Sequence, residues 1–151
     1  MTDCTLGTPL RRLEDPRLIT GQGRYVDDIR IDGMLAVAFV RSTEAHALIR
    51  SIDVADAVGM PGVVGVFTAA DLDLTRPMPN PHPHPLLEKS VQASPLSHTE
   101  VSYVGEPVAV VVAETRYQAA DAAELVFVDY EPLPAVTSIE RAVEPDAPLV
   151  H

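Results

Sequence analysis

Two histidines stand two positions apart in the proline-rich run PNPHPHPLL, residues 79–87, and are the first candidates for chemistry. Imidazole is a common metal ligand, and His82 and His84 would share one face of an extended strand, whose side chains repeat every two residues. The alternating prolines favour a polyproline path, whose three-residue period turns the two rings apart. A metal site also needs three or four convergent ligands, and no third ligand is evident nearby. We therefore expect solvated histidines rather than a metal site.

The remaining histidines and the single cysteine do not make a recognisable catalytic centre. Ser42, Glu44 and His46 have the side chains of a nucleophile, an acid and a base. However, a catalytic triad is assembled by the fold from distant parts of a chain, not from near neighbours in sequence. Cys4 lies near the N-terminus without the basic neighbours that activate a thiolate. We assign no catalytic, cofactor-binding or metal-binding residue to the sequence, whose other histidines are His98 and His151.

A glycine pair and an acidic cluster offer two further interpretations, both weak. Gly21 and Gly23 give part of the dinucleotide fingerprint, but the third glycine is missing and the following residues do not begin a helix. We expect a turn there. Asp27, Asp28 and Asp32 could supply oxygen ligands for calcium or magnesium, yet their spacing does not follow an EF-hand loop. We expect surface carboxylates.

Composition narrows the classes of function. The chain has 151 residues, 46% of them hydrophobic, which is enough for one domain with a core. Twenty-two acidic and eleven basic residues give a net charge of −11, which disfavours nucleic acid and anionic membranes as partners. One cysteine excludes an internal disulfide, and no apolar stretch is long enough to span a membrane. We expect a soluble, cytoplasmic protein.

The elements that would position these residues fall into two blocks. Residues 1–34 are polar and rich in glycine, and they predict an extended arm with a turn that packs as part of the domain. Residues 35–151 predict a single domain. Its first block has a continuous apolar strand at 35–41, typical of burial on both faces, a weaker alternating strand at 49–52 within the segment 47–54, and a strand at 63–67. A short helix capped by Asp53 and ended by Gly59 separates the last two.

The second block carries the clearest signals. Residues 108–113 predict a buried strand, and Thr115 with Gln118 forms a capping-box signature at the start of a helix. Alanines place small side chains on one stripe of that helix, and a further strand follows at 125–130. A proline-rich loop at about 74–99 separates the blocks, a length that is usually functional, mobile or docked on a partner. The sequence predicts an α+β domain with a small mixed sheet and short helices packed on it.

Several runs resemble one family of enzymes. They are RRLEDPRLIT (11–20), GQGRYVDDI (21–29), RS (41–42), AHA (45–47), MPGV (60–63), YVGEPVAVVVAET (103–115), AADAAELV (119–126) and VDYEPLP (128–134). Together they look like the N-terminal α/β hammerhead domain of the large, molybdenum-binding subunit of the xanthine dehydrogenase, aldehyde oxidase and carbon monoxide dehydrogenase family. The likeness covers almost the whole chain apart from the proline-rich loop.

The resemblance implies a component of a molybdenum hydroxylase, an oxidoreductase acting on aldehydes, N-heterocycles or carbon monoxide. It places molybdopterin in a partner large subunit or in a missing C-terminal region, and iron–sulfur clusters and FAD in other subunits. The residues that hold molybdopterin and the family's catalytic glutamate lie in that later region, so no family catalytic residue carries over. We expect a non-catalytic hammerhead domain or split small subunit, inactive in isolation.

The chain departs from the family's sequence pattern at two places. The family commonly reads Arg-Ser-Pro-His/Tyr-Ala-His-Ala where this chain has RSTEAHA, residues 41–47, and the loop at 76–99 falls where family members vary in length. Three questions about the nature of the chain stay open. The chain could be a natural subunit or a fragment of a longer polypeptide. It could also be a stand-alone interaction module derived from such a domain. A free-standing metal protein that uses His82 and His84 is the third alternative.

Overall fold

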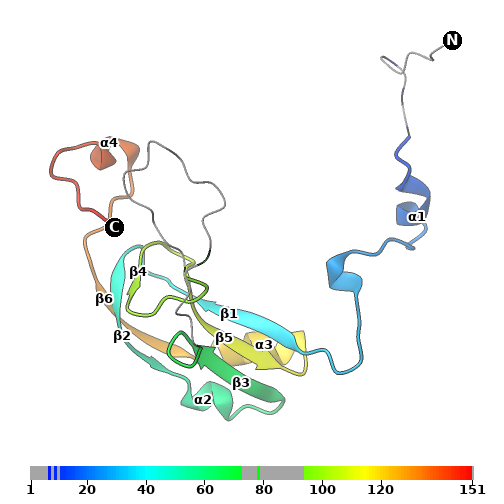
Figure 1. Cartoon of the computed structure of the whole chain (residues 1–151), viewed down its shortest axis with the longest axis horizontal. Helices are drawn as coiled ribbons and strands as arrows, with labels where there is room; N and C mark the ends of the chain where they lie inside the picture. The colour runs from blue at the N-terminus through cyan, green and yellow to red at the C-terminus, as the bar shows by residue number, and fades with distance from the viewer. Residues whose placement is uncertain (1–6, 8, 10, 73–77, 79–93, 151) are drawn as a thin grey trace. The chain divides into compact units, whose positions relative to one another are not determined.

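The computed structural model describes residues 7, 9, 11–72, 78 and 94–150 (Figure 1). His82, His84, Cys4 and His151 lie outside these residues, as does most of the proline-rich loop. The chain divides into two compact units, residues 1–34 and 35–151, which are described separately.

Among the described residues of the second unit, six strands form two three-stranded antiparallel sheets. The first sheet has the order β1-β5-β3, and the second has the order β4-β2-β6. The strands of the first sheet are β1 (Ala36–Arg41), β3 (Val63–Thr68) and β5 (Pro107–Ala113). Those of the second are β2 (Ala47–Asp53), β4 (Glu100–Val101) and β6 (Phe127–Pro132).

The α+β class predicted from the sequence is confirmed. The prediction of a small mixed sheet is wrong, because the described strands form two antiparallel sheets. Successive strands alternate between the two sheets, so that odd-numbered strands build the first and even-numbered strands build the second. Each connection therefore carries the chain from one sheet to the other, and α3, which follows β5, leads into β6 of the second sheet. The alternation of strand and helix that indicates parallel pairing arises here without any parallel pair among the described strands.

The main helix is α3 (Arg116–Ala123), which packs on β1 and β5 (Figure 1). Thr115 caps it as predicted, because its hydroxyl accepts from the backbone N–H of Gln118 at 3.3 Å. Ala119 and Ala122 are fully buried, so the small side chains do allow the helix to lie close to the sheet. The short helix α2 (Ala55–Val58) packs against β3 and α3.

Two clusters of buried residues hold the sheets together. The larger one joins α2 and α3 to the inner face of the first sheet through Ala57, Ala122, Val66 and Val111. The smaller one lies between the sheets and consists of Ala47, Val101 and Val108. The clusters share partly buried contacts that run from one sheet to the other, namely Val40, Ile52 and Val128. The domain thus has a continuous core of aliphatic side chains.

The last residues of the loop predicted at about 74–99, residues 94–99, belong to the described structure. Leu96 is almost fully buried, and the backbone N–H of Ser97 donates to Pro107 O at 2.8 Å. The chain then enters β4, which no sequence pattern indicated because two residues carry no period. Tertiary burial of Leu96 and Val101 fixes this segment in place.

The described residues of the unit 1–34 form two short helical elements where the sequence predicted extended chain. They are α1 (Asp15–Ile19) and the 3₁₀ turn η1 (Val26–Asp28). Pro16 stands in the first turn of α1, a position where its missing N–H costs nothing. Gly21 ends this helix with φ +71°. Its N–H donates to Leu18 O, and the N–H of Gln22 donates to Arg17 O. This is the hydrogen-bond pattern of a Schellman cap, so the predicted turn is a helix end.

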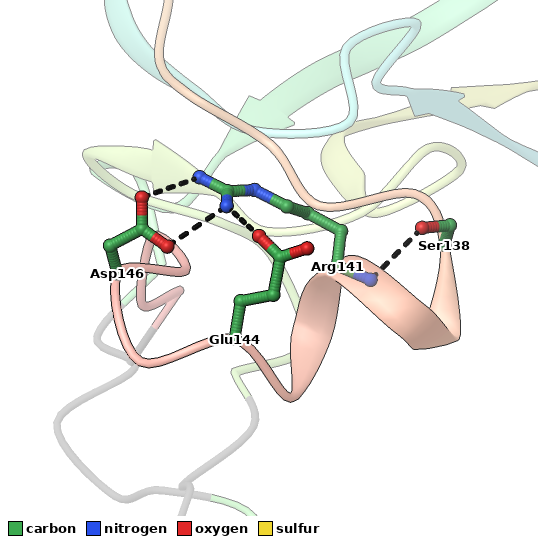
Figure 2. A network of polar contacts seen from close by, with 4 residues as sticks. All are labelled: Ser138, Arg141, Glu144 and Asp146. Atoms are coloured by element: carbon green, nitrogen blue, oxygen red, sulfur yellow. Dashed lines mark hydrogen bonds and ion pairs between the residues drawn. The ribbon is translucent and has the colours of Figure 1, made fainter.

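The last helix of the second unit is α4 (Ile139–Ala142), and a network of polar contacts joins it to the residues that follow (Figure 2). Ser138 caps the helix by accepting from the backbone N–H of Arg141 at 3.2 Å. The guanidinium of Arg141 pairs with Asp146 at 2.9 Å and with Glu144, and these partners raise its pKa further above the usual range. The network closes the chain back onto α4. No described helix is long and apolar enough to cross a membrane.

Candidate functional site

His46 is a buried polar side chain of the second unit with a hydrogen-bond partner at each ring nitrogen. It lies just before β2 with only 7% of its surface exposed, and both ring nitrogens face oxygen acceptors. Nδ1 is 2.8 Å from Pro134 O, and Nε2 is 2.6 Å from Glu100 Oε1. The hydrogen bond to the Pro134 carbonyl, followed by that to Glu100, raises the pKa of His46 above 6.5 despite the opposing effect of burial. The geometry favours an imidazolium that donates from both nitrogens.

This arrangement makes His46 a structural tether. A doubly donating imidazolium has no free lone pair for a metal ion or for a substrate proton. Its two acceptors come from β4 and from the segment after β6, and the backbone N–H of Leu133 also donates to His46 O at 2.8 Å. His46 therefore fastens three separate segments at one end of the second sheet.

Ser42 does not form a triad with Glu44 and His46. Its hydroxyl is hydrogen-bonded to the backbone of Glu44, with Oγ 3.0 Å from both the N and the O of that residue. Its own backbone pairs with Glu106 O and with the N–H of Gly105, both at 2.8 Å. The turn between β1 and β2 thus uses Ser42 to fix its backbone, and the histidine ring points to partners elsewhere.

The acidic cluster of the first unit has a local role as well. Asp28 Oδ2 accepts from the backbone N–H of Tyr25 at 2.9 Å and so caps the η1 turn. Among the described residues, no group of three or more His, Cys, Asp or Glu side chains is placed to hold a metal ion. His98 is exposed and lines a hollow of about 270 Å³ together with β2 residues and Ser97. The prediction for His82 and His84 lies outside the described residues.

The surface of the first sheet that faces away from α3 is apolar. Cross-strand partners share a face, and the register pairs Phe39 and Phe67 with Val110, and Val37 and Gly65 with Val112. We call the face formed by Val37, Phe39, Gly65, Phe67, Val110 and Val112 the outer apolar face. Val37 is 53% exposed and Phe39 is 48% exposed. The prediction of burial on both faces of the strand at 35–41 is therefore wrong for this chain by itself.

Glycine shapes the middle of that face. A Cβ at Gly65 would come within 2.9 Å of the Phe67 ring, so the ring lies over the bare backbone of its own strand. The aromatic side chain thus shields a backbone segment that glycine leaves open. At the edge of the face, the Arg41 guanidinium stacks on Phe39 at 5.6 Å from the ring centre and donates to Gly105 O.

Sequence reasoning found the strands that carry these residues but missed the tether. Its neighbours in the sequence suggest His46 only as the base of a triad, whereas its acceptors lie 54 and 88 residues away. No local spacing marks such a contact. The continuous apolar pattern of residues 35–41 was the available signal for the outer apolar face.

Comparison with known proteins gives consistent matches across the chain. The family described as "Aldehyde oxidase and xanthine dehydrogenase, a/b hammerhead domain" matches residues 20–134. The carbon monoxide dehydrogenase large chain of Afipia carboxidovorans is 50% identical over 146 residues, which are 97% of this chain and 17% of that protein. This chain therefore spans about a sixth of the length of that relative.

Solved structures confirm the hammerhead architecture. A crystal structure of Cu,Mo-CO dehydrogenase in its carbon monoxide reduced state matches with a TM-score of 0.80 at 47% identity, over 95% of this chain and 17% of that chain. The aldehyde oxidoreductase of Desulfovibrio desulfuricans ATCC 27774 matches with a TM-score of 0.86 at 28% identity, over 96% of this chain and 16% of that chain. Each of these proteins continues far beyond the matched part.

Proposed function

This chain belongs to the a/b hammerhead family of the molybdenum hydroxylase large subunits, and from that premise we propose that it is a non-catalytic scaffold of such an enzyme. As a domain or as a separate small subunit, it would complete the molybdenum-binding part of an oxidoreductase. The observation that carries the proposal is the 50% identity that extends over 97% of this chain but only 17% of the carbon monoxide dehydrogenase large chain.

The polar groups of the described residues support a scaffold role. The buried side chains of His46 and Ser42 are both engaged by partners within the domain. Arg50 and Arg141 are paired with carboxylates, and Arg41 with a backbone carbonyl. A molybdopterin needs donors for its phosphate and pterin, and these described side chains are already satisfied by other partners. These side chains are therefore already occupied, and we assign the cofactor to the remainder of the large subunit.

The partners follow from the same premise. A molybdopterin-binding polypeptide would be the direct partner, and iron–sulfur and flavin subunits would complete the electron path. Such a component has no turnover of its own, because the reacting atoms are held elsewhere. The rigid aliphatic core and the tether at His46 suit a part that holds its shape while other parts react.

Co-purification tests this proposal. The tagged chain, co-expressed with the molybdopterin-binding polypeptide of its own organism, is expected to bring that polypeptide and bound molybdenum through affinity and size-exclusion chromatography. Free chain assayed with an aldehyde, a purine or carbon monoxide is expected to show no turnover. Absence of any stable complex, or turnover by the partner-free chain, would contradict the proposal.

A further inference from the structure

The outer apolar face of the first sheet has the composition of a buried surface. Its residues are valine, phenylalanine and glycine, and they occupy cross-strand positions on all three strands. An antiparallel sheet with one face in water normally alternates apolar and polar residues along each strand. Residues 36–40 of β1 are apolar on both faces, as are residues 108–113 of β5. A layer that covers the outer face would account for both patterns.

The charge of the chain makes this face stand out. With 22 acidic and 11 basic residues in the sequence, carboxylates are abundant, yet none stands at any position of β1, β3 or β5. Arg41 borders it but turns its guanidinium over Phe39 and toward Gly105 O. Contiguous apolar surface of this kind marks interaction sites in soluble proteins.

We propose that the outer apolar face docks directly on the molybdopterin-binding polypeptide of the enzyme, an inference that rests on the proposed function. The carbon monoxide dehydrogenase large chain is about six times the length of the matched part, so a large protein body accompanies this domain in its relatives. A second copy of this chain fits less well, because each copy brings a net charge of −11 to the contact.

The test compares two phenylalanines that stand on the outer faces of the two sheets. Phe39 lies on the outer apolar face, on strand β1, whereas Phe127 lies on β6 of the second sheet and is 65% exposed. Phe39→Glu and Phe127→Glu introduce the same charge in place of the same side chain. Both positions are exposed enough that the free chain is expected to fold with either substitution, which circular dichroism checks.

The readout is the amount of molybdopterin-binding polypeptide recovered with the tagged chain after co-expression. Phe39→Glu is expected to lower recovery at least tenfold, because a carboxylate would be buried against apolar surface, whereas Phe127→Glu is expected to change it less than twofold. Val37→Ser is a milder second variant for the same face, expected to lower recovery severalfold.

The outcomes separate the two proposals. If the unsubstituted chain recovers its partner and all three variants do so equally well, the docking face is wrong while the proposed function stands. If the unsubstituted chain recovers no partner, the proposed function fails and the docking proposal fails with it. If Phe39→Glu only converts a dimer of this chain to a monomer without affecting partner recovery, a second copy occupies the face and the proposal is overturned.

Discussion

The two sheets share one aliphatic core but turn very different faces outward. The outer apolar face of the first sheet carries Val37, Phe39 and Phe67. The outer side of the second sheet carries one large apolar side chain, Phe127, among charged residues that include Asp129 and an ion pair between Arg50 and Glu131. The outer side of the second sheet is largely charged, as a solvated surface is, whereas the outer apolar face of the first sheet has the residue composition of a protein interior. This difference is the basis of our proposal that the outer apolar face of the first sheet docks on another protein.

The largest expected effect on the free energy of unfolding comes from the inner side of the first sheet, and a substitution on the outer side serves as the comparison. Val111→Ala removes two methyl groups from a fully buried position on β5 and is expected to lower the free energy of unfolding by about 2–3 kcal/mol. Val37→Ala, on the outer apolar face, is expected to cost less than about 1 kcal/mol in the free chain. Urea denaturation of both variants measures this. Equal losses would show that the outer apolar face is already covered within the chain.

The next effect concerns the tether of the second sheet. His46→Gln keeps a polar side chain but loses the imidazolium between Glu100 and Pro134, and is expected to cost about 1–3 kcal/mol at pH 6. The folded chain holds the proton of His46 more tightly than the unfolded chain, because its pKa is raised above 6.5. This stabilisation is complete below pH 6.5 and is lost as the pH rises through the raised pKa.

Thermal unfolding across pH 5.5–9 measures that dependence. The unsubstituted chain is expected to lose stability as the pH rises above 6.5 and passes through the raised pKa of His46, and His46→Gln is expected to lose less. An identical pH profile for the two proteins would mean that His46 is not held as a cation in the folded chain.

The smallest expected effect lies on the solvated face. Arg50 and Glu131 are each about half exposed, so a double-mutant cycle with alanine at both positions is expected to give a coupling below about 1 kcal/mol that shrinks in 0.5 M salt. A coupling of several kcal/mol, insensitive to salt, would show that this pair is shielded from water and that the second sheet is also covered.

Much of the fold could be predicted from local pattern. The apolar strands at 35–41, 63–67 and 108–113 and the helix capped by Thr115 are present, because burial and capping act over a few residues. The separation into two sheets and the two-residue strand β4 could not be predicted, because they depend on contacts between distant segments.

The site was harder to predict for the same reason. The partners of His46 are brought to it by the fold, and Glu100 gives no sign in the sequence that it will meet a histidine. The outer apolar face was visible in the sequence, since residues 35–41 are apolar at nearly every position. What the sequence could not show is that the domain covers only one of the two faces of this strand.

Thiol labelling in the assembled enzyme tests the central claim most directly. In a Cys4→Ser background, which removes the single native cysteine, Val37→Cys places a thiol on the outer apolar face and Asp129→Cys places one on the solvated face. Both are expected to react with a maleimide in the free chain. In complex with the molybdopterin-binding polypeptide, we predict that the thiol of Val37→Cys is protected while that of Asp129→Cys still reacts. Equal reactivity of both thiols in the complex would contradict the account.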